Sequence, residues 1–266
     1  MIANYHTHTY RCQHAFGKDE EYVEKAIAEN LEILGFSDHV PSFPRQDGYV
    51  SYYKMRYDEV DGYFNSIESL KEKYADKIDI KCGYEAEYFK DRFKEEFEFM
   101  KQRRPEYLIL GQHYVDYERK NGVRGNHSDR SPMPCLETDR IKPYADIMVE
   151  AISTDLFSCV AHPDVLTYTG PEQDYYLEQM SRIIEAAIKH GVPLEYNLLG
   201  QVLGRHYPRL DFWQLAADMK ATVILGCDAH EPARVAVKEE IDEAKSRLSK
   251  LGIKLIDKME LRNPFK

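Results

Sequence analysis

Short apolar runs with the character of buried strands recur along the chain, and segments with helical spacing lie between them. Apolar residues at every third or fourth position indicate a helix, whereas short apolar runs bounded by turn residues indicate strands. The strand-like runs are Ile2 to Tyr5, Ile33 to Phe36, Ile78 to Tyr84, Tyr107 to Leu110, Phe157 to Ala161, Pro193 to Tyr196 and Val223 to Cys227. Helical spacing is found at Tyr22 to Leu34, Asp58 to Tyr74, Tyr144 to Leu156, Tyr176 to His190, Phe212 to Met219 and Pro232 to Leu251. This alternation predicts an α/β fold in which seven parallel strands are covered by helices.

Two segments interrupt the alternation. Val40 to Tyr57 is rich in proline, glycine and tyrosine, and Tyr114 to Pro143 contains turn-forming pairs such as Asn121-Gly122. Loops of this length in a compact domain usually cover or form a binding site, so the tyrosines of Tyr49 to Tyr57 either line a lid or pack within their own loop. No stretch has the composition of a linker, and we expect one domain spanning residues 1–266.

Composition and charge exclude several classes of partner. No apolar run approaches the roughly 18 residues that a membrane-spanning helix requires. The formal charge of −10 argues against broad binding to nucleic acid or anionic lipid, which need a basic surface. The sequence begins without the basic and apolar regions of a signal peptide, so a cytoplasmic location is expected. The five cysteines are scattered and form no C-x-x-C pair, which predicts reduced thiols rather than a zinc ribbon or a disulfide framework.

Histidines and carboxylates gather where the predicted strands end. His6-Thr7-His8 follows the first strand and Asp228-Ala229-His230 follows the last. Residues i and i+2 of an extended chain point to the same side, so each triplet directs two ligand atoms toward one place. His14 follows the first triplet, and the ends of the strands in between carry Asp38, His39, Glu85, His113, His162 and Asn197. Because the active site of an α/β barrel forms at this edge, the pattern predicts one shared site.

The chemistry of these residues indicates a centre with two or three metal ions. One histidine near a strand end is usually an ordinary polar residue, but agreement among six strands favours a common role. The donors exceed what one four-coordinate ion needs, and a mixture of imidazole and carboxylate without thiolate suits Zn, Mn or Fe. Glu87 has the same strand parity as Glu85, so spacing does not separate them. Asp38 either orients a ligand ring or caps the following loop.

The motifs together resemble the polymerase-and-histidinol-phosphatase (PHP) family of metal-dependent phosphoesterases. They are H-x-H at the N-terminus, a histidine six residues later, G-F-S-D-H, G-Y-E, G-x-H, A-H-P and C-D-A-H, and they run from His6 to His230. The resemblance implies a distorted seven-stranded, TIM-like (β/α)7 barrel with three divalent ions at the C-terminal end of the strands. It implies a first metal held by His6, His8, Glu85 and Asp228, a second by Glu85, His113 and His162, and a third by His14, His39 and His230. The G-x-E pattern favours Glu85 over Glu87 as the carboxylate that bridges two ions.

The resemblance also implies an activity, and His14 favours the histidinol-phosphate phosphatase branch. The expected reaction is hydrolysis of L-histidinol phosphate to L-histidinol and phosphate, a step of histidine biosynthesis, by attack of a metal-bridging hydroxide. Arg205 is the expected phosphate clamp, with a plain surface arginine as the alternative, and His206 either protonates the leaving group or packs beside Tyr207. Other small esters, phosphotyrosine or a non-catalytic metal-binding role remain as alternatives. The native metal, the general acid and the oligomeric state stay open.

Overall fold

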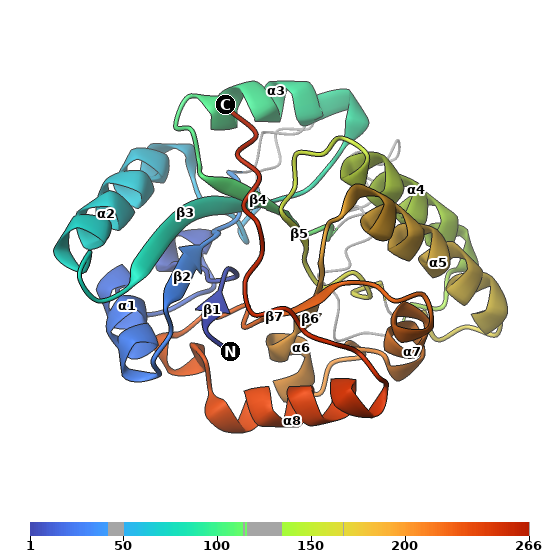
Figure 1. The fold of residues 1–266 in the computed structure, drawn as a ribbon. Coiled ribbons are helices and arrows are strands. Elements are labelled where there is room, and N and C mark those ends of the chain that lie inside the picture. Colours follow the sequence, from blue (N-terminus) through green and yellow to red (C-terminus); the bar gives the residue numbers. More distant parts are fainter. Residues whose placement is uncertain (42–50, 114, 116–134, 167, 266) are drawn as a thin grey trace.

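The computed structural model describes residues 1–41, 51–113, 115, 135–166 and 168–265, and these form a curved parallel sheet surrounded by helices (Figure 1). Within these ranges the strands are β1 (Ala3–Asn4), β2 (Ile33–Phe36), β3 (Asp79–Ala86), β4 (Tyr107–Leu110), β5 (Cys159–Val160), β6 (Leu194–Asn197) and β7 (Val223–Gly226). They follow one another in sequence order, and each pairs with the next in parallel. A parallel bridge between Thr7 and Ala229 connects the two edges. The predicted seven-stranded TIM-like barrel is therefore confirmed.

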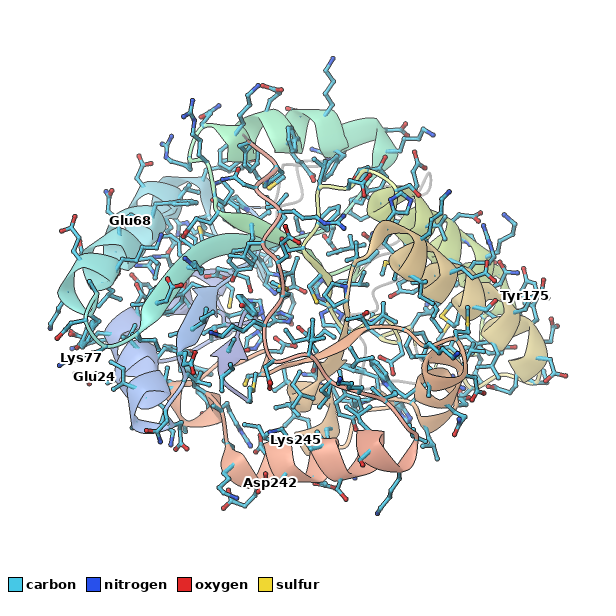
Figure 2. All side chains as sticks on the ribbon, viewed as in Figure 1. Glu24, Glu68, Lys77, Tyr175, Asp242 and Lys245 are labelled. Carbon is cyan, nitrogen blue, oxygen red and sulfur yellow. The ribbon has the colours of Figure 1, made fainter. Side chains whose placement is uncertain are left out.

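Helices cover the outside of the barrel. They are α1 (Asp19–Ala28), α2 (Val60–Lys73), α3 (Lys90–Lys101), α4 (Ile141–Ile152), α5 (Gln173–His190), α6 (Leu198–Val202), α7 (Leu210–Asp218) and α8 (Lys238–Lys250). Charged side chains project from their outer faces, as Figure 2 shows for Glu24, Glu68, Asp242 and Lys245. None of the helices in the described ranges is long and apolar enough to cross a membrane.

Alternation along the strands divides the core into two layers. On β4, Leu108 and Leu110 pack with the helices, whereas Tyr107 and Ile109 belong to a smaller cluster inside the barrel. The other buried members of this inner cluster are Ala3, Tyr5, Cys159, Ala161, Ile224 and Met259. The Tyr107 hydroxyl spans the interior and donates to the Tyr5 carbonyl oxygen at 2.8 Å. Filling the barrel in this way leaves the C-terminal end of the strands as the place for polar chemistry.

The last residues of the described chain close the opposite end of the barrel and cross in front of it in Figure 1. The Ile256 amide donates to the carbonyl oxygen of Val223, the first residue of β7, at 2.9 Å. Further along, the Arg262 amide donates to Ser158 Oγ at 2.9 Å. Buried Met259 between them joins the inner cluster. The tail thus covers the N-terminal ends of the strands.

Several predicted boundaries were wrong. The first helix ends at Ala28 rather than Leu34, because Asn30 adopts a left-handed φ of 59° and the chain then enters β2. Helix α3 was not predicted, because charged residues dominate it and its buried residues are only Phe93, Glu96 and Met100. The predicted helix from Pro232 to Leu251 is divided, since Ala236 has a φ of 56° and α8 begins only at Lys238.

The long predicted loops are partly described. Residues 42–50 of the first and 116–134 of the second lie outside the described ranges. The second loop ends earlier than predicted, because α4 begins at Ile141. Strand β3 continues to Ala86, two residues beyond the predicted end at Tyr84, so Glu85 lies within the strand. This position fixes the side chain of Glu85 more firmly than a loop would.

Candidate metal centre

The side chains of the first and last predicted triplets meet at the C-terminal rim of the barrel. His6 Nε2 and His8 Nε2 are 3.1 Å apart. Asp228 Oδ1 lies 3.1 Å from His8 Nε2 and 3.5 Å from His6 Nε2. Although more than two hundred residues separate these segments in sequence, the pairing of Thr7 with Ala229 brings their ligand atoms together.

Glu85 lies at the centre of the site, where its two carboxylate oxygens face different imidazoles. Oε1 is 2.9 Å from His162 Nε2 and 3.4 Å from His113 Nε2. On the other side, Oε2 is 2.9 Å from His39 Nδ1. The same oxygen also faces His8 Nε2 at 3.4 Å and His6 Nε2 at 3.5 Å. Oε2 is nevertheless buried without a hydrogen bond of good geometry among the described residues, as expected for an atom that faces a cation.

His14 and His230 provide the clearest test of whether a metal fits. Their Nε2 atoms are 2.9 Å apart, while each Nδ1 lies within 2.9 Å of a backbone carbonyl oxygen, that of Cys12 and of Asp228 respectively. Carbonyl oxygens only accept hydrogen bonds, so both Nδ1 atoms carry the proton. Burial and the nearby His8 lower the pKa of both rings, which favours their neutral forms. Two Nε2 lone pairs then face each other, and a cation relieves their repulsion.

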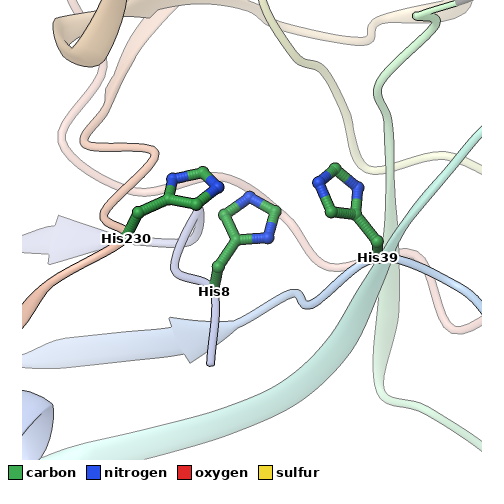
Figure 3. Close-up of side chains that lie close together, drawn as sticks. All are labelled: His8, His39 and His230. Atoms are coloured by element: carbon green, nitrogen blue, oxygen red, sulfur yellow. The ribbon is translucent and has the colours of Figure 1, made fainter. Parts of the chain in front are cut away.

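A third group of imidazoles completes this side of the site. His8, His39 and His230 come from the ends of three different strands, and their rings lie together in Figure 3. Their nitrogen donors lie within 4.8 Å of one another. The ring centroids of His8 and His230 are 4.1 Å apart and those of His8 and His39 are 4.4 Å apart. The candidate ligand of the first implied ion, His8, therefore lies directly beside two candidate ligands of the third, His39 and His230.

Three further carboxylates lie behind the ligand rings. Glu195 Oε2 is 2.7 Å from His6 Nδ1, Asp38 Oδ1 is 3.5 Å from His8 Nδ1, and Glu87 Oε1 is 3.5 Å from His113 Nδ1. Of the three, only Glu195 lies at hydrogen-bond distance, where a carboxylate holds the proton on Nδ1 and directs the Nε2 lone pair away from itself. Glu87 therefore lies behind the His113 ring, farther from the centre of the site than Glu85, and Asp38 lies beside the His8 ring. Sequence reasoning gave Glu195 no role, although its spacing of two from Asn197 puts both on the inner face.

The electrostatics of the buried site couple acids and bases. Burial lowers the pKa of His6, but the carboxylates of Glu195, Asp228 and Glu85 outweigh it and raise that pKa well above its usual value. Burial likewise raises the pKa of Glu85, yet the imidazoles led by His39 and His113 lower it well below its ordinary value. Glu85 therefore remains ionised, as metal binding requires.

A cavity of about 350 Å³ opens above these residues. Its walls are His14, His39, Tyr53, Lys54, Glu85, His113, His162, Val165, Leu199, Leu203, Arg205, Tyr207, Asp228 and His230. The structure thus places Arg205 at the cavity, where it donates to the Tyr207 hydroxyl at 2.8 Å. His206, by contrast, is exposed and is not among the lining residues. Sequence reasoning gave no site role to Lys54, Val165, Leu199 or Leu203, whose types carry no metal-ligand signal.

The family model described as the PHP domain matches residues 4–198, which include most of the candidate ligands. The chain belongs to the PHP family. A probable histidinol-phosphatase from Deinococcus radiodurans is 26% identical over 245 residues, covering 89% of both chains. Another from Schizosaccharomyces pombe is 25% identical over 275 residues, covering 95% of this chain and 88% of that protein. The crystal structure of a Lactococcus lactis histidinol phosphate phosphatase complexed with zinc, L-histidinol and phosphate has the same fold, with a TM-score of 0.67, 19% identity and coverage of 96% and 95%.

The position of Glu85 in this PHP chain depends on a neighbouring glycine. A Cβ atom at Gly111 would lie 1.8 Å from Glu85 Oε1. We predict that Gly111→Ala displaces the carboxylate, lowers the metal content of the purified protein and reduces the free energy of unfolding by about 1–3 kcal/mol. Elemental analysis and denaturant unfolding measure the two effects.

Gly62→Ala is the matched control for this substitution. Gly62 lies in α2, where an added Cβ would meet nothing within 4 Å. Replacing glycine by alanine at such a helical position is expected to stabilise the protein by roughly 0.5–1 kcal/mol and to leave its metal content unchanged. A Gly111→Ala protein with the metal content of the wild type would show that Glu85 does not need this space.

Proposed function

We propose that this chain is a metal-dependent phosphomonoesterase whose substrate is L-histidinol phosphate, which would place it in histidine biosynthesis. The observation that carries the proposal is the pair of Nε2 atoms of His14 and His230, which face each other at 2.9 Å beside a cavity lined by Arg205. The named relatives and the ligands bound to the Lactococcus lactis protein support the choice of substrate.

Three divalent ions, Zn, Mn or Fe, are proposed for the site. The orientation of the two carboxylate oxygens of Glu85 supports a bridging role. Oε1 faces His113 and His162, whereas Oε2 faces His39 on the other side. The proposed ligand sets are His6, His8, Glu85 and Asp228 for the first ion, Glu85, His113 and His162 for the second, and His14, His39 and His230 for the third. Divalent ions in such sites activate water for attack on phosphorus and neutralise charge on the phosphoryl oxygens.

The protein's own side chains position the ester. Among the described residues, Arg205 donates to the hydroxyl group of Tyr207 and forms no ion pair with a carboxylate. Its guanidinium therefore keeps the charge and the planar donors that pair with two phosphoryl oxygens. Lys54 also lines the cavity, but its charge is balanced by an ion pair with Glu87. Leu199 and Leu203 supply apolar surface for the organic part of the ester.

Replacement of Arg205 should separate phosphate binding from metal binding. Arg205→Ala is expected to lower kcat/KM for the ester by about 10- to 100-fold, because a hydrogen bond to a charged group contributes about 1.5–3 kcal/mol. Metal content should not change, since Arg205 contacts none of the ligands. Arg247→Ala, on the exposed face of α8, is the control and should leave both quantities unchanged. Unchanged kinetics in Arg205→Ala would remove this residue from the site.

The substrate is tested by comparing kcat/KM across phosphate esters. Protein reconstituted separately with Zn, Mn and Fe would be assayed with L-histidinol phosphate, other small phosphomonoesters, phosphodiesters and phosphotyrosine. We expect the highest kcat/KM for L-histidinol phosphate. A higher value for another ester would reassign the substrate within the same reaction class. Bound metal without hydrolysis of any ester would instead indicate a metal-binding module.

A further inference from the structure

Glu195 is a buried carboxylate whose place in the barrel is prepared by a glycine. It belongs to β6, is 2% exposed and lies on the inner face of the barrel. A Cβ atom at Gly226 on the adjacent strand β7 would lie only 2.2 Å from Glu195 Oε2. The glycine therefore leaves the space that this carboxylate occupies. Burying an ion in this way is costly unless it is well paired, so its partners indicate its purpose.

The first partner of Glu195 is a proposed metal ligand. Glu195 Oε2 lies 2.7 Å from His6 Nδ1, and an ionised carboxylate only accepts hydrogen bonds. When the ring binds a metal through Nε2, its remaining proton lies on Nδ1, and Nε2 is directed toward His8 and Asp228. Glu195 thereby selects both the tautomer and the rotation of the His6 ring.

The second partner is Asn197, whose amide connects two carboxylates. Its Nδ2 donates to Glu195 Oε1 at 2.8 Å and to Asp228 Oδ2 at 3.1 Å. The amide nitrogen has two protons, and these two acceptors use both of them. With Oδ2 held in this way, Oδ1 of Asp228 is the oxygen that faces His8, at 3.1 Å. Asn197 therefore orients Asp228 much as Glu195 orients His6.

The other end of the Asn197 amide reaches the cavity wall. Asn197 is the N-cap of α6, and its Oδ1 accepts from the Gly200 amide at 2.9 Å. Gly200 also binds the chain that follows α6, because the Arg205 amide donates to the Gly200 carbonyl oxygen at 3.0 Å. One side chain thus touches a metal-site carboxylate and the helix that precedes the proposed phosphate clamp.

We infer that Glu195 and Asn197 form a positioning pair that holds His6 and Asp228 in their metal-binding orientations and connects them to the segment that carries Arg205. Neither residue is among those that line the cavity. The inference rests on the proposed metal-binding function of the site, but it does not depend on which ester is hydrolysed. The competing view is that the pair only satisfies buried polar groups and stabilises the fold.

Zinc affinity, measured by competition with a chromophoric chelator, separates the two views without reference to turnover. Glu195→Gln keeps the shape of the side chain but removes its charge, and we expect zinc to bind about 10- to 100-fold more weakly, as is typical when such a partner of a ligand is lost. Glu195→Asp, which keeps the carboxylate, should recover part of this loss. Glu106→Gln is the control, because Glu106 pairs with Lys71 and the Cys82 amide and contacts no proposed ligand.

Two substitutions of Asn197 test the connection to the cavity wall. Asn197→Asp keeps the acceptor for the Gly200 amide but replaces both donors with a charge that repels Glu195 and Asp228. It should weaken zinc binding while KM for the ester, measured at saturating zinc, stays within about twofold of the wild type. Asn197→Ala also removes the cap of α6 and should raise KM as well as weaken zinc binding.

The outcomes distinguish this inference from the proposed function. Wild-type zinc affinity in Glu195→Gln, together with a loss of thermal stability like that of Glu106→Gln, would overturn the positioning role. Equal KM values in Asn197→Ala and Asn197→Asp would overturn the connection to Arg205. Weakened zinc binding in a protein that hydrolyses no phosphate ester would support the positioning role and reject the proposed function.

Discussion

Glu85→Gln is expected to abolish most of the activity and to remove bound metal. The substitution takes a negative charge from the middle of five imidazoles and replaces one of two anionic oxygens with an amide that repels cations. Loss of a partner behind a ligand already costs about 10- to 100-fold in metal affinity or activity, so a central ligand should cost more than about 100-fold in kcat/KM. Elemental analysis and steady-state kinetics on the same preparation measure both effects.

Glu87→Gln is the matched control, because it makes the same chemical change two residues away. Glu87 contacts the His113 amide and Lys54 and faces the far side of the His113 ring. Its loss should reduce metal affinity by no more than about 100-fold and leave activity measurable at saturating metal. If Glu87→Gln lost more activity and metal than Glu85→Gln, the central carboxylate would be misassigned.

Removal of the metals should inactivate the protein and lower its thermal stability together. Without a cation, the neutral rings of His14 and His230 hold their lone pairs face to face, and Glu85 Oε2 is buried without a hydrogen bond of good geometry. Ligand present at one hundred times its dissociation constant stabilises the bound state by about 2.7 kcal/mol. For a domain of this size, that free energy corresponds to roughly 5–10 °C in Tm. Calorimetry before and after dialysis against a chelator measures the shift.

Readdition of metal provides the control for this experiment. Zn, Mn or Fe should restore both activity and Tm, whereas Mg, a harder ion that prefers oxygen ligands, should restore little of either. Chelator with a molar excess of Zn should have no effect. Full turnover by protein that contains less than about 0.1 metal ion per chain would contradict a metal-dependent reaction.

The barrel, and the contact between the first and last ligand triplets, could be predicted from the sequence for a simple physical reason. Strand parity places His6 with His8 and Asp228 with His230, and parallel strands bring their C-terminal ends to one rim. The family and fold predictions are confirmed. The roles of individual ligands remain predictions, although the structure gathers all nine proposed metal ligands around Glu85 and the cavity.

The remaining features depended on information that spacing does not contain. Glu85 and Glu87 share one strand parity, so only the G-x-E pattern favoured Glu85, and the structure places this residue among five imidazoles and against Gly111. Glu195 was overlooked because a carboxylate within an apolar strand carries no motif, and its partner His6 is 189 residues away. Helix α3 was not predicted because most of its residues are charged and few are buried.

The filled interior of the barrel determines how the cavity exchanges its contents. Tyr5, Tyr107 and Met259 occupy the axis beneath the histidines, and the C-terminal tail covers the far end. Among the described residues, the barrel axis therefore offers no passage from the cavity to the opposite end of the strands. Because the product phosphate must leave from the cavity that the ester enters, we expect accumulating phosphate to compete with fresh ester for that cavity. In progress curves, the rate of hydrolysis should therefore fall sooner than substrate depletion alone would cause.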